Sequence, residues 1–458
     1  MSPEPESVDL ALWFEAALLP DGWAKDVRIG VRSGRIVSID TGVGRAPTDT
    51  GGGVGLPGVT NVHSHAFQRA MAGLTEARGP SDDDFWTWRE LMYRFLDRGG
   101  PDEIEAITAL AFAEMLEGGF TRVTEFHYLH NDPAGAAYAD RSEIAGRVVA
   151  AAQASGIALT LLPVFYTHAG FGAQPPAQGQ RRFITDLDGF ADLVGACRRL
   201  TEGMADVCVG VAPHSLRAVS ADQLAVLPGL AQGGPIHIHV AEQTKEVEDC
   251  LAWSGARPVE WLLNHAPVDT RWCLIHATHV TEDEWREVVA RGAVVGLCPI
   301  TEANLGDGVF PASAYVRAGG QFGVGTDSNV QIGLAEELRM LEYSQRLTSR
   351  GRAMMADPER STGRALFERA LAGGAQAGGV SGGLAVGQAA DIVSLDTRRF
   401  AFAGRSGDAV LDSWVFGAPS GSIASVWRTG REVVRDGRHV ARDAIEARCR
   451  AALKAVLA

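Results

Sequence analysis

Short apolar runs alternate with longer segments of helical periodicity through the middle of the chain. Short apolar runs bounded by glycine or polar residues are typical of strands buried on both faces, and their alternation with helices predicts repeated βα units. Eight such units close into a parallel barrel with the helices outside. The predicted strands are Gly58 to Val62, Thr121 to Phe126, Ala158 to Phe165, Val207 to Ala212, Pro235 to Val240, Trp272 to Ile275, Ala293 to Cys298 and Gln321 to Gly325.

Both ends of the chain instead contain short runs that are typical of an antiparallel sheet. Apolar and polar residues alternate from Val27 to Arg32, and a second run, Arg35 to Ile39, follows Ser33-Gly34, so this segment predicts a β-hairpin. Similar runs near glycine turns return at Ala390 to Leu395 and at Ser425 to Val434. We therefore expect the two ends to pack together as one small domain.

The whole pattern predicts an α/β fold, a TIM-like (β/α)8 barrel with a small β-sandwich domain built from both chain ends. The barrel is expected over residues 57–382. The small domain is expected over residues 1–56 and 383–458, where the last segment, Asp443 to Ala458, has the spacing of a terminal helix. A chain of 458 residues is long enough for one large domain and one small one.

The composition narrows the expected partners. Hydrophobic residues make up 46% of the chain and the mean hydropathy is near zero, which is typical of a globular protein. The formal net charge of −14 disfavours nucleic acid and acidic membrane surfaces. No apolar stretch reaches the roughly 18 residues of a membrane span, the first residues are acidic, and the six cysteines form no CxxC pair. We expect a cytoplasmic protein with reduced thiols that acts on a small molecule.

The segment His63-Ser64-His65 follows the first predicted barrel strand. Side chains alternate along a strand, so these two imidazoles point to the same face and are able to reach one metal ion. The motif alone is weak evidence, because two such histidines also occur as ordinary residues inside a barrel or at its surface. Its interpretation depends on further ligands.

Further candidate ligands lie at or just past the ends of other predicted strands. His239 and Glu242 do so at the fifth strand, His276 at the sixth and Asp327 at the eighth, and the C-terminal ends of barrel strands form the active-site face of such folds. Three imidazoles and a carboxylate suit zinc or ferrous iron, with water as a further ligand. Glu242 is expected to shuttle protons, although a lone glutamate is more often a solvated loop charge. His237 lies deeper on the same strand and predicts a buried, hydrogen-bonded histidine. The predicted metal ligands are His63, His65, His239 and Asp327.

This order of residues resembles the amidohydrolase superfamily, with HxH after strand one, HxxE after strand five, His after strand six and Asp after strand eight. Many binuclear members of that superfamily use a carbamylated lysine after strand four. Here strand four ends at Val211-Ala212-Pro213-His214 without a lysine. The resemblance therefore favours a deaminase-like site with one metal ion.

Three longer segments, NVHSHAFQRAMAGLTE (Asn61 to Glu76), FWTWRELMYRF (Phe85 to Phe95) and APHSLRAV (Ala212 to Val219), resemble the formimidoylglutamate deiminase family. The likeness runs through almost the whole chain. It implies hydrolytic deamination of N-formimino-L-glutamate to N-formyl-L-glutamate and ammonia, in histidine degradation, by a water molecule that one metal ion activates. The expected cofactor is one divalent metal ion, Zn2+ or alternatively Fe2+.

A substrate with two carboxylates requires cationic partners. Arg89 and Arg217 are able to form bidentate contacts with carboxylates, although Arg89 alone equally predicts an ion pair on a helix surface. The resemblance implies a substrate-binding set that adds neutral hydrogen-bonding side chains. This set is Gln68, Arg89, Tyr128, His214 and Arg217.

We expect three catalytic residues in that site. Asp327 takes a proton from water, His276 holds the developing oxygen, and Glu242 passes a proton to the departing nitrogen. The aromatic residues Trp86, Trp88, Tyr93 and Phe95 are interpreted as packing over the barrel mouth, and the segment Gly170 to Gln180 as a flexible loop able to cover the site.

Two alternative functions stay open at this point. The first is another mononuclear deaminase of the same superfamily that acts on guanine, cytosine or an adenosine derivative. The second is a catalytically silent barrel that serves as a subunit of an assembly. The expected partner is a small dicarboxylate substrate, with no nucleic acid and no membrane, and a homodimer is one expected assembly.

Overall fold

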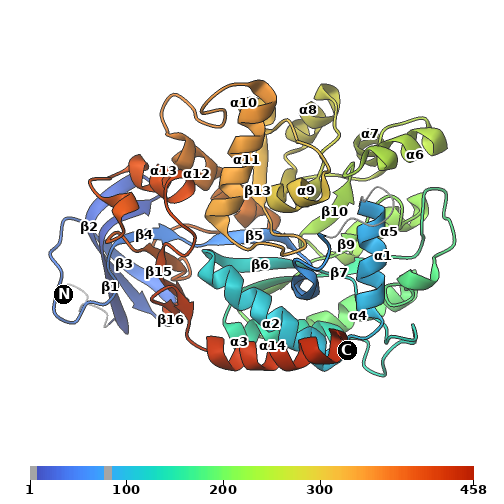
Figure 1. The fold of residues 1–458 in the computed structure, drawn as a ribbon, viewed down its shortest axis with the longest axis horizontal. Coiled ribbons are helices and arrows are strands. Elements are labelled where there is room, and N and C mark those ends of the chain that lie inside the picture. The colour runs from blue at the N-terminus through green and yellow to red at the C-terminus, as the bar shows by residue number, and fades with distance from the viewer. Residues whose placement is uncertain (1–7, 77–84, 458) are drawn as a thin grey trace, which may run out of the picture.

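A barrel of parallel strands lies beside a sheet that both chain ends build (Figure 1). The computed structural model describes residues 8–76 and 85–457, without the side chains of residues 85–87 and 91. The barrel strands are β5 (Val59–Ser64), β6 (Phe120–His127), β7 (Ala158–Phe165), β8 (Val207–Val209), β9 (Ala212–Pro213), β10 (Ile236–Val240), β11 (Trp272–His276), β12 (Val294–Leu297) and β13 (Gln321–Val324).

Two junctions close the barrel. The sheets β5-β6-β7-β8 and β10-β11-β12-β13 are each hydrogen-bonded in that order, and β9 pairs with β7. At one junction, the amide of His239 donates to the carbonyl oxygen of His214 at 3.0 Å. At the other, the amide of Asp327 donates to His63 O at 3.0 Å and the amide of His65 donates to Asp327 O at 2.9 Å. The second junction brings the ends of the first and last strands together.

The predicted barrel strands agree with the observed ones to within two residues at either end. The fourth predicted strand is divided into β8 and β9, which Gly210 and Val211 separate. A Cβ atom at this glycine would lie 2.3 Å from the carbonyl oxygen of Pro235, so the close approach of the two segments requires glycine. All residues of β5, β7 and β10 are buried, as expected for strands with both faces covered.

Helices surround the barrel and begin at capping residues. The side chains of Asp186, Ser220, Thr281 and Ser361 each accept a backbone N–H in the first turn of the helix that follows. The helices and short 3₁₀ turns of this layer are η1 (Ala66–Met71), α1 (Phe85–Leu96), α2 (Pro101–Glu117), α3 (Glu143–Ser155), η2 (Gln178–Gln180), α4 (Leu187–Leu200), α5 (Ala221–Leu230), α6 (Thr244–Ser254), α7 (Pro258–His265), α8 (Glu282–Arg291), α9 (Pro299–Leu305), α10 (Ala312–Arg317), α11 (Leu334–Ser349) and α12 (Thr362–Ala377).

The small domain contains one continuous sheet in the order β17-β16-β15-β14-β4-β1-β2-β3. The rings of Phe14 and Trp427 lie 5.9 Å apart, although β4 and β14 separate their strands in this order. The sheet therefore curls on itself, and its two layers belong to one sheet. Its strands are β1 (Leu10–Leu19), β2 (Gly22–Arg32), β3 (Arg35–Asp40), β4 (Val54–Pro57), β14 (Ile392–Leu395), β15 (Ile423–Arg428), β16 (Arg431–Arg435) and β17 (Arg438–His439).

The predicted hairpin is confirmed as β2 and β3. Ser33 and Gly34 form its turn with φ angles of +48° and +77°, the left-handed conformations that a tight hairpin turn requires. The β domain expected from both chain ends is likewise confirmed, since β4 pairs with both β1 and β14.

The chain returns to the barrel after the small sheet. Helix α13 (Asp408–Phe416) packs against α11 and α12, and α14 (Arg442–Leu457) runs along α2 (Figure 1). Arg442 of α14 pairs with Glu114 at 2.9 Å and with Glu117 at 2.7 Å, both on α2. The predicted division at residues 57 and 383 stays a prediction. In the described ranges, no helix combines the length and apolar character that crossing a membrane requires.

Candidate metal centre and substrate pocket

Four buried side chains from the ends of three barrel strands converge on one point. The Nε2 atoms of His63 and His239 lie 3.0 Å apart, and Asp327 Oδ1 lies 3.4 Å from Nε2 of both His63 and His65. One ligand atom from each of the four residues lies within 4.8 Å of the others. The four residues predicted as metal ligands are therefore neighbours.

The hydrogen bonds behind two of these histidines define which nitrogen faces the centre. His65 Nδ1 lies 3.1 Å from the carbonyl oxygen of Phe126, and His239 Nδ1 lies 3.0 Å from that of His214. A carbonyl oxygen only accepts, so each Nδ1 carries the proton and each Nε2 directs a lone pair inward. Lone pairs and a carboxylate oxygen that face one another repel unless a cation lies between them. This donor set fits a divalent cation.

The protonation states of the four residues also fit a cation. Burial lowers the pKa values of His65 and His239, and it lowers the pKa of His63 to about 3, so the imidazoles stay neutral as metal binding requires. Burial alone would raise the pKa of Asp327. The hydrogen bond to His63 and the neighbouring histidines outweigh it, so the pKa of Asp327 is lowered and the carboxylate is ionised.

Three residues at or just after the ends of barrel strands have strained backbone. Ala241, His276 and Asp327 have φ angles of +53°, +66° and +42°. A non-glycine residue in this region costs roughly 1–3 kcal/mol, so the surrounding structure must hold it. Glu246 Oε1 accepts from the amide of Ala241 at 3.2 Å, and Asn329 Nδ2 donates to the carbonyl oxygen of Asp327 at 2.9 Å.

A second group of ionisable side chains adjoins the first. His276 Nε2 lies 3.8 Å from Glu242 Oε1 and 3.9 Å from Asp327 Oδ2, and its Nδ1 lies 3.2 Å from Glu302 Oε1. Burial disfavours the charged imidazole, but Glu242 and Glu302 together raise the pKa of His276. Burial raises the pKa of Glu242 to about 7. This group is able both to donate and to accept protons near neutral pH.

Two buried carboxylates that the sequence analysis did not select support these residues. Glu302 Oε1 accepts from the amide of Cys298 at 2.9 Å as well as from His276. Glu246 accepts from the amide of Glu242 at 3.2 Å, and its Oε2 lies 3.9 Å from Arg217 Nη2. Each is a glutamate near the start of a short helix, which in sequence resembles a solvated residue. The one available signal was that the helices carrying them, α9 and α6, come after barrel strands.

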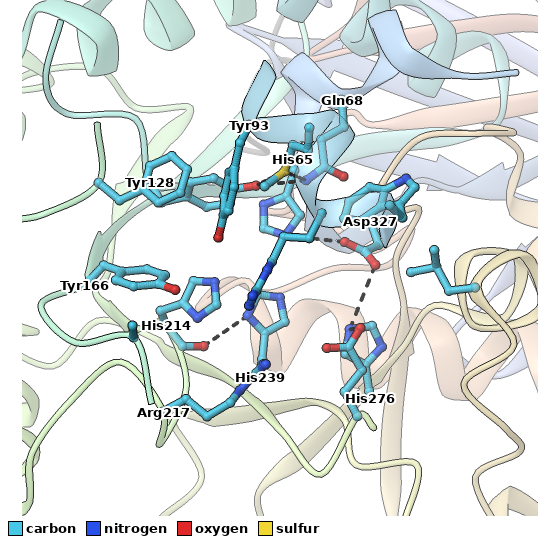
Figure 2. A pocket seen from close by; sticks show the side chains of 17 residues that line it. His65, Gln68, Tyr93, Tyr128, Tyr166, His214, Arg217, His239, His276 and Asp327 are labelled. Carbon is cyan, nitrogen blue, oxygen red and sulfur yellow. Dashed lines mark hydrogen bonds and ion pairs between the residues drawn. The ribbon is translucent and has the colours of Figure 1, made fainter. Parts of the chain in front are cut away.

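All five residues of the predicted substrate-binding set line one pocket with the catalytic candidates (Figure 2). His63 lies behind the pocket wall and contacts it through His65 and His239. The lining residues are His65, Gln68, Trp88, Arg89, Met92, Tyr93, Tyr128, Tyr166, Ala169, Phe183, His214, Arg217, His239, Glu242, His276, Leu305 and Asp327.

Contacts within the pocket fix several of these side chains. Gln68 Nε2 donates to the hydroxyl oxygen of Tyr128 at 2.8 Å. The guanidinium of Arg89, from α1, lies 5.7 Å from the ring centroid of Tyr93. Arg217 is only 9% exposed and is held near Glu246. Two guanidinium groups and several neutral hydrogen-bonding groups therefore share a pocket with the metal-ligand set.

The aromatic residues expected to pack over the barrel mouth divide into two groups. Trp88 and Tyr93 line the pocket, whereas Phe95 is buried in the layer behind it. The side chain of Trp86 lies outside the described residues. Tyr166 also lines the pocket and was not selected from the sequence, although its position after the third strand was a signal.

His237 has the structural role expected of it. Its Nε2 lies 2.8 Å from the carbonyl oxygen of Ala377, away from the metal-ligand set. Strand four is followed by His214 and carries no lysine, as the sequence indicates. The neighbourhood therefore lacks the side chain that would be carbamylated in a binuclear site.

Comparison with known proteins agrees with this architecture. Residues 54–433 match the description of the amidohydrolase family, so the chain belongs to that family. Residues 11–53 match the N-terminal domain of formimidoylglutamate deiminase HutF. The chain is 49% identical to a formimidoylglutamate deiminase of Pseudomonas aeruginosa, over 94% of this chain and 95% of the relative. Within the amidohydrolases, it is a member of the formimidoylglutamate deiminase family.

Solved structures give the same result. An amidohydrolase from Brucella melitensis is 52% identical and superposes with a TM-score of 0.95. The superposition covers 98% of this chain and 100% of that structure's chain. An adenosine deaminase from Xanthomonas campestris, solved with bound zinc, is 23% identical with a TM-score of 0.84 over 99% of both chains. The second likeness shows the shared fold.

Proposed function

We propose that this chain hydrolyses N-formimino-L-glutamate to N-formyl-L-glutamate and ammonia, which would give it a role in histidine degradation. The observation that carries the proposal is the presence of Arg89 and Arg217 in the pocket that also contains the metal-ligand set. Two guanidinium groups match a substrate with two carboxylates, and they provide local positive charge in a chain with a net charge of −14. The activity named for the Pseudomonas aeruginosa relative supports the same substrate.

We propose that His63, His65, His239 and Asp327 hold one divalent cation, with zinc as the native metal and iron as the alternative. The neutral imidazoles and the ionised carboxylate support this assignment. When bound, such a cation would bring the pKa of a water molecule close to neutrality. The zinc bound in the structurally similar adenosine deaminase supports the choice of metal.

The chain's own residues supply the proton transfers in this proposal. Asp327 accepts a proton from the water that attacks the formimino carbon. Its Oδ1 faces the histidines of the metal centre, and its Oδ2 faces His276. His276 donates a hydrogen bond from Nε2 to the oxygen as it gains charge. Glu242, whose pKa burial raises to about 7, is able to exist in both protonation states at neutral pH.

The reaction balances with these groups alone. Water adds to the formimino carbon as one of its protons goes to Asp327 and the proton of Glu242 goes to the terminal nitrogen, so the carbon–nitrogen double bond becomes single. The proton of the new hydroxyl group then passes through Glu242 to that nitrogen as the carbon–nitrogen bond breaks, and the proton held by Asp327 restores Glu242. Ammonia leaves, and the oxygen of water remains as the formyl oxygen. Arg89 and Arg217 hold the carboxylates in place during these steps, with Gln68, Tyr128 and His214 as neutral partners.

Ammonia release tests the proposal. The zinc-loaded protein is expected to release ammonia from N-formimino-L-glutamate, and to act on guanine, cytosine and adenosine far more slowly. Preference for one of the three ring substrates would support the alternative of another mononuclear deaminase. No turnover of any substrate by protein that contains stoichiometric metal would support a catalytically silent barrel. The homodimer stays a prediction, which sedimentation velocity would test.

A further inference from the structure

A hydrogen bond beside the pocket has a direction that the structure defines. Gln180 Oε1 accepts from the backbone amide of Ala177 at 2.7 Å, which identifies that atom as the amide oxygen. The other end of the same side chain is therefore the NH2 group. It donates to the hydroxyl oxygen of Tyr166 at 2.6 Å.

Because Gln180 donates to it, Tyr166 must direct its own hydroxyl proton elsewhere. Among the residues whose side chains the structure describes, Gln180 is the one hydrogen-bond partner of the Tyr166 hydroxyl, and no acceptor for the hydroxyl proton is found there. Burial raises the pKa of Tyr166, against the opposing charges of Arg217 and Arg89, so the hydroxyl is protonated at neutral pH. A buried O–H donor without a protein acceptor is costly unless a ligand or water accepts its proton.

The hydroxyl of Tyr166 faces the pocket. Its ring centroid lies 4.4 Å from that of His214, and Tyr166 lines the same cavity as Arg89 and Arg217. Figure 2 shows the hydroxyl end of the ring on its inner side, toward His214 and the middle of the pocket. A ligand carboxylate held by an arginine there would supply the missing acceptor.

We propose that Tyr166 is a substrate-binding residue whose hydroxyl donates to one carboxylate of the bound dicarboxylate, next to Arg217, and that Gln180 sets the direction of this hydrogen bond. The identity of the substrate as a dicarboxylate rests on the proposed function above. The loop from Gly170 to Gln180 thereby contributes to substrate recognition through Gln180, without touching the substrate.

Tyr166→Phe tests the donor. A hydrogen bond to a charged group is worth enough that its loss raises KM for N-formimino-L-glutamate by roughly tenfold to hundredfold, whereas kcat changes little because no proton transfer uses this hydroxyl. The control is Tyr315→Phe, which removes another buried hydroxyl whose proton goes to the carbonyl oxygen of Gln321, outside the pocket. An unchanged KM in Tyr166→Phe, with wild-type turnover, would overturn the proposal.

Gln180→Glu tests the direction. A carboxylate at this position still accepts from the amide of Ala177, but its second oxygen accepts the proton of Tyr166 and withdraws it from the pocket. We expect KM to rise in this variant too. In the double variant with Tyr166→Phe, the effect of Gln180→Glu should shrink to that of the added charge alone. Fully additive effects on KM would contradict the assigned direction.

A binding measurement separates this proposal from the proposed function. If the wild-type protein releases no ammonia from N-formimino-L-glutamate, the proposed function fails, and glutarate binding to the zinc-loaded protein by calorimetry still decides the role of Tyr166. Weaker glutarate binding in Tyr166→Phe, with wild-type binding in Tyr315→Phe, supports it. Equal binding in both variants, or no binding to the wild-type protein, overturns it.

Discussion

His63 and His239 bring their Nε2 atoms to 3.0 Å from opposite parts of the barrel, one on β5 and the other on β10. His239 Nε2 carries a lone pair, because its Nδ1 donates to a carbonyl oxygen. A cation at this point relieves the repulsion among lone pairs and the Asp327 carboxylate. We therefore expect removal of the metal by a chelator to lower the melting temperature, and zinc to restore it, by differential scanning fluorimetry.

Substitution at β10 gives a matched test of the metal centre. His239→Ala is expected to lose bound metal, measured by inductively coupled plasma mass spectrometry, together with all turnover. His237→Gln is the control, because His237 lies two residues earlier on the same strand and its Nε2 contacts the carbonyl oxygen of Ala377 instead. Equal metal loss in both variants would mean that strand integrity, and not ligation by His239, controls metal content.

Glu302 should control the orientation of His276. Its Oε1 accepts from His276 Nδ1 at 3.2 Å and from the amide of Cys298 at 2.9 Å, so it fixes the ring with Nε2 toward Glu242. Glu302→Ala is expected to lower kcat by roughly tenfold to hundredfold, the size of a lost hydrogen bond to a charged group, with KM and metal content nearly unchanged.

Glu302→Gln gives the corresponding rescue. Its amide oxygen still accepts both hydrogen bonds, so this variant should recover part of the kcat that Glu302→Ala loses. The downfield proton NMR signal of His276 Nδ1–H should persist in Glu302→Gln and disappear in Glu302→Ala. If both variants keep wild-type kcat, the orientation of His276 does not depend on Glu302.

Most of the fold followed from the pattern of apolar residues, but β1 did not. The sequence Leu10–Leu19 (LALWFEAALL) contains four leucines and three alanines, which are good helix formers. It is a strand because it pairs along nearly its whole length with β2 and because β4 lies on its other side. Such tertiary pairing overrides local propensity and cannot be read from one segment.

The candidate site was predictable to the extent that its residues lie at or just after the C-terminal ends of barrel strands. His63, His239 and Asp327 belong to this class, because the end of a barrel strand defines on which face of the fold a residue lies. Glu246 could not be selected, since its contact with the amide of Ala241 depends on a positive φ angle that no propensity indicates. The role of Tyr166 could not be inferred from the sequence, because it depends on the hydrogen bond that Gln180 donates from a loop.

Arg217 should contribute to substrate affinity more than to the chemical step. It lies in the pocket near Glu246, and its charge opposes the burial that raises the pKa of Glu242. In the proposed function it binds a carboxylate and takes no part in the proton transfers. Arg217→Met is expected to raise KM for N-formimino-L-glutamate by at least about tenfold, as for loss of a charge-assisted contact. Arg147→Met, which removes an ion-paired arginine on the outside of the barrel, is the control and should leave KM unchanged. A rise in KM in neither variant would exclude Arg217 from carboxylate binding.

Glu125 on β6 should make the stability of the protein depend on pH. Burial raises the pKa of this carboxyl from 4.5 to about 8, against the hydrogen bond that its Oε1 accepts from the amide of Ala66 at 2.7 Å. Between these two values the folded state keeps a proton that the unfolded state has lost. Stability from this group is therefore fully present below pH 4.5 and is lost as the pH rises toward about 8, by at most about 1.4 kcal/mol per pH unit.

Glu125→Gln should remove this loss, because the amide is neutral at every pH and retains an oxygen that accepts from Ala66. The free energy of unfolding of the variant, relative to the wild type, is expected to increase between pH values of about 5 and about 8, measured by chemical denaturation with the same metal loading. Glu287→Gln is the matched control for the same replacement at a surface position, because its carboxylate is half exposed on α8. If the difference for Glu125→Gln varies with pH no more than that for Glu287→Gln, Glu125 ionises at the same pH in the folded and unfolded states.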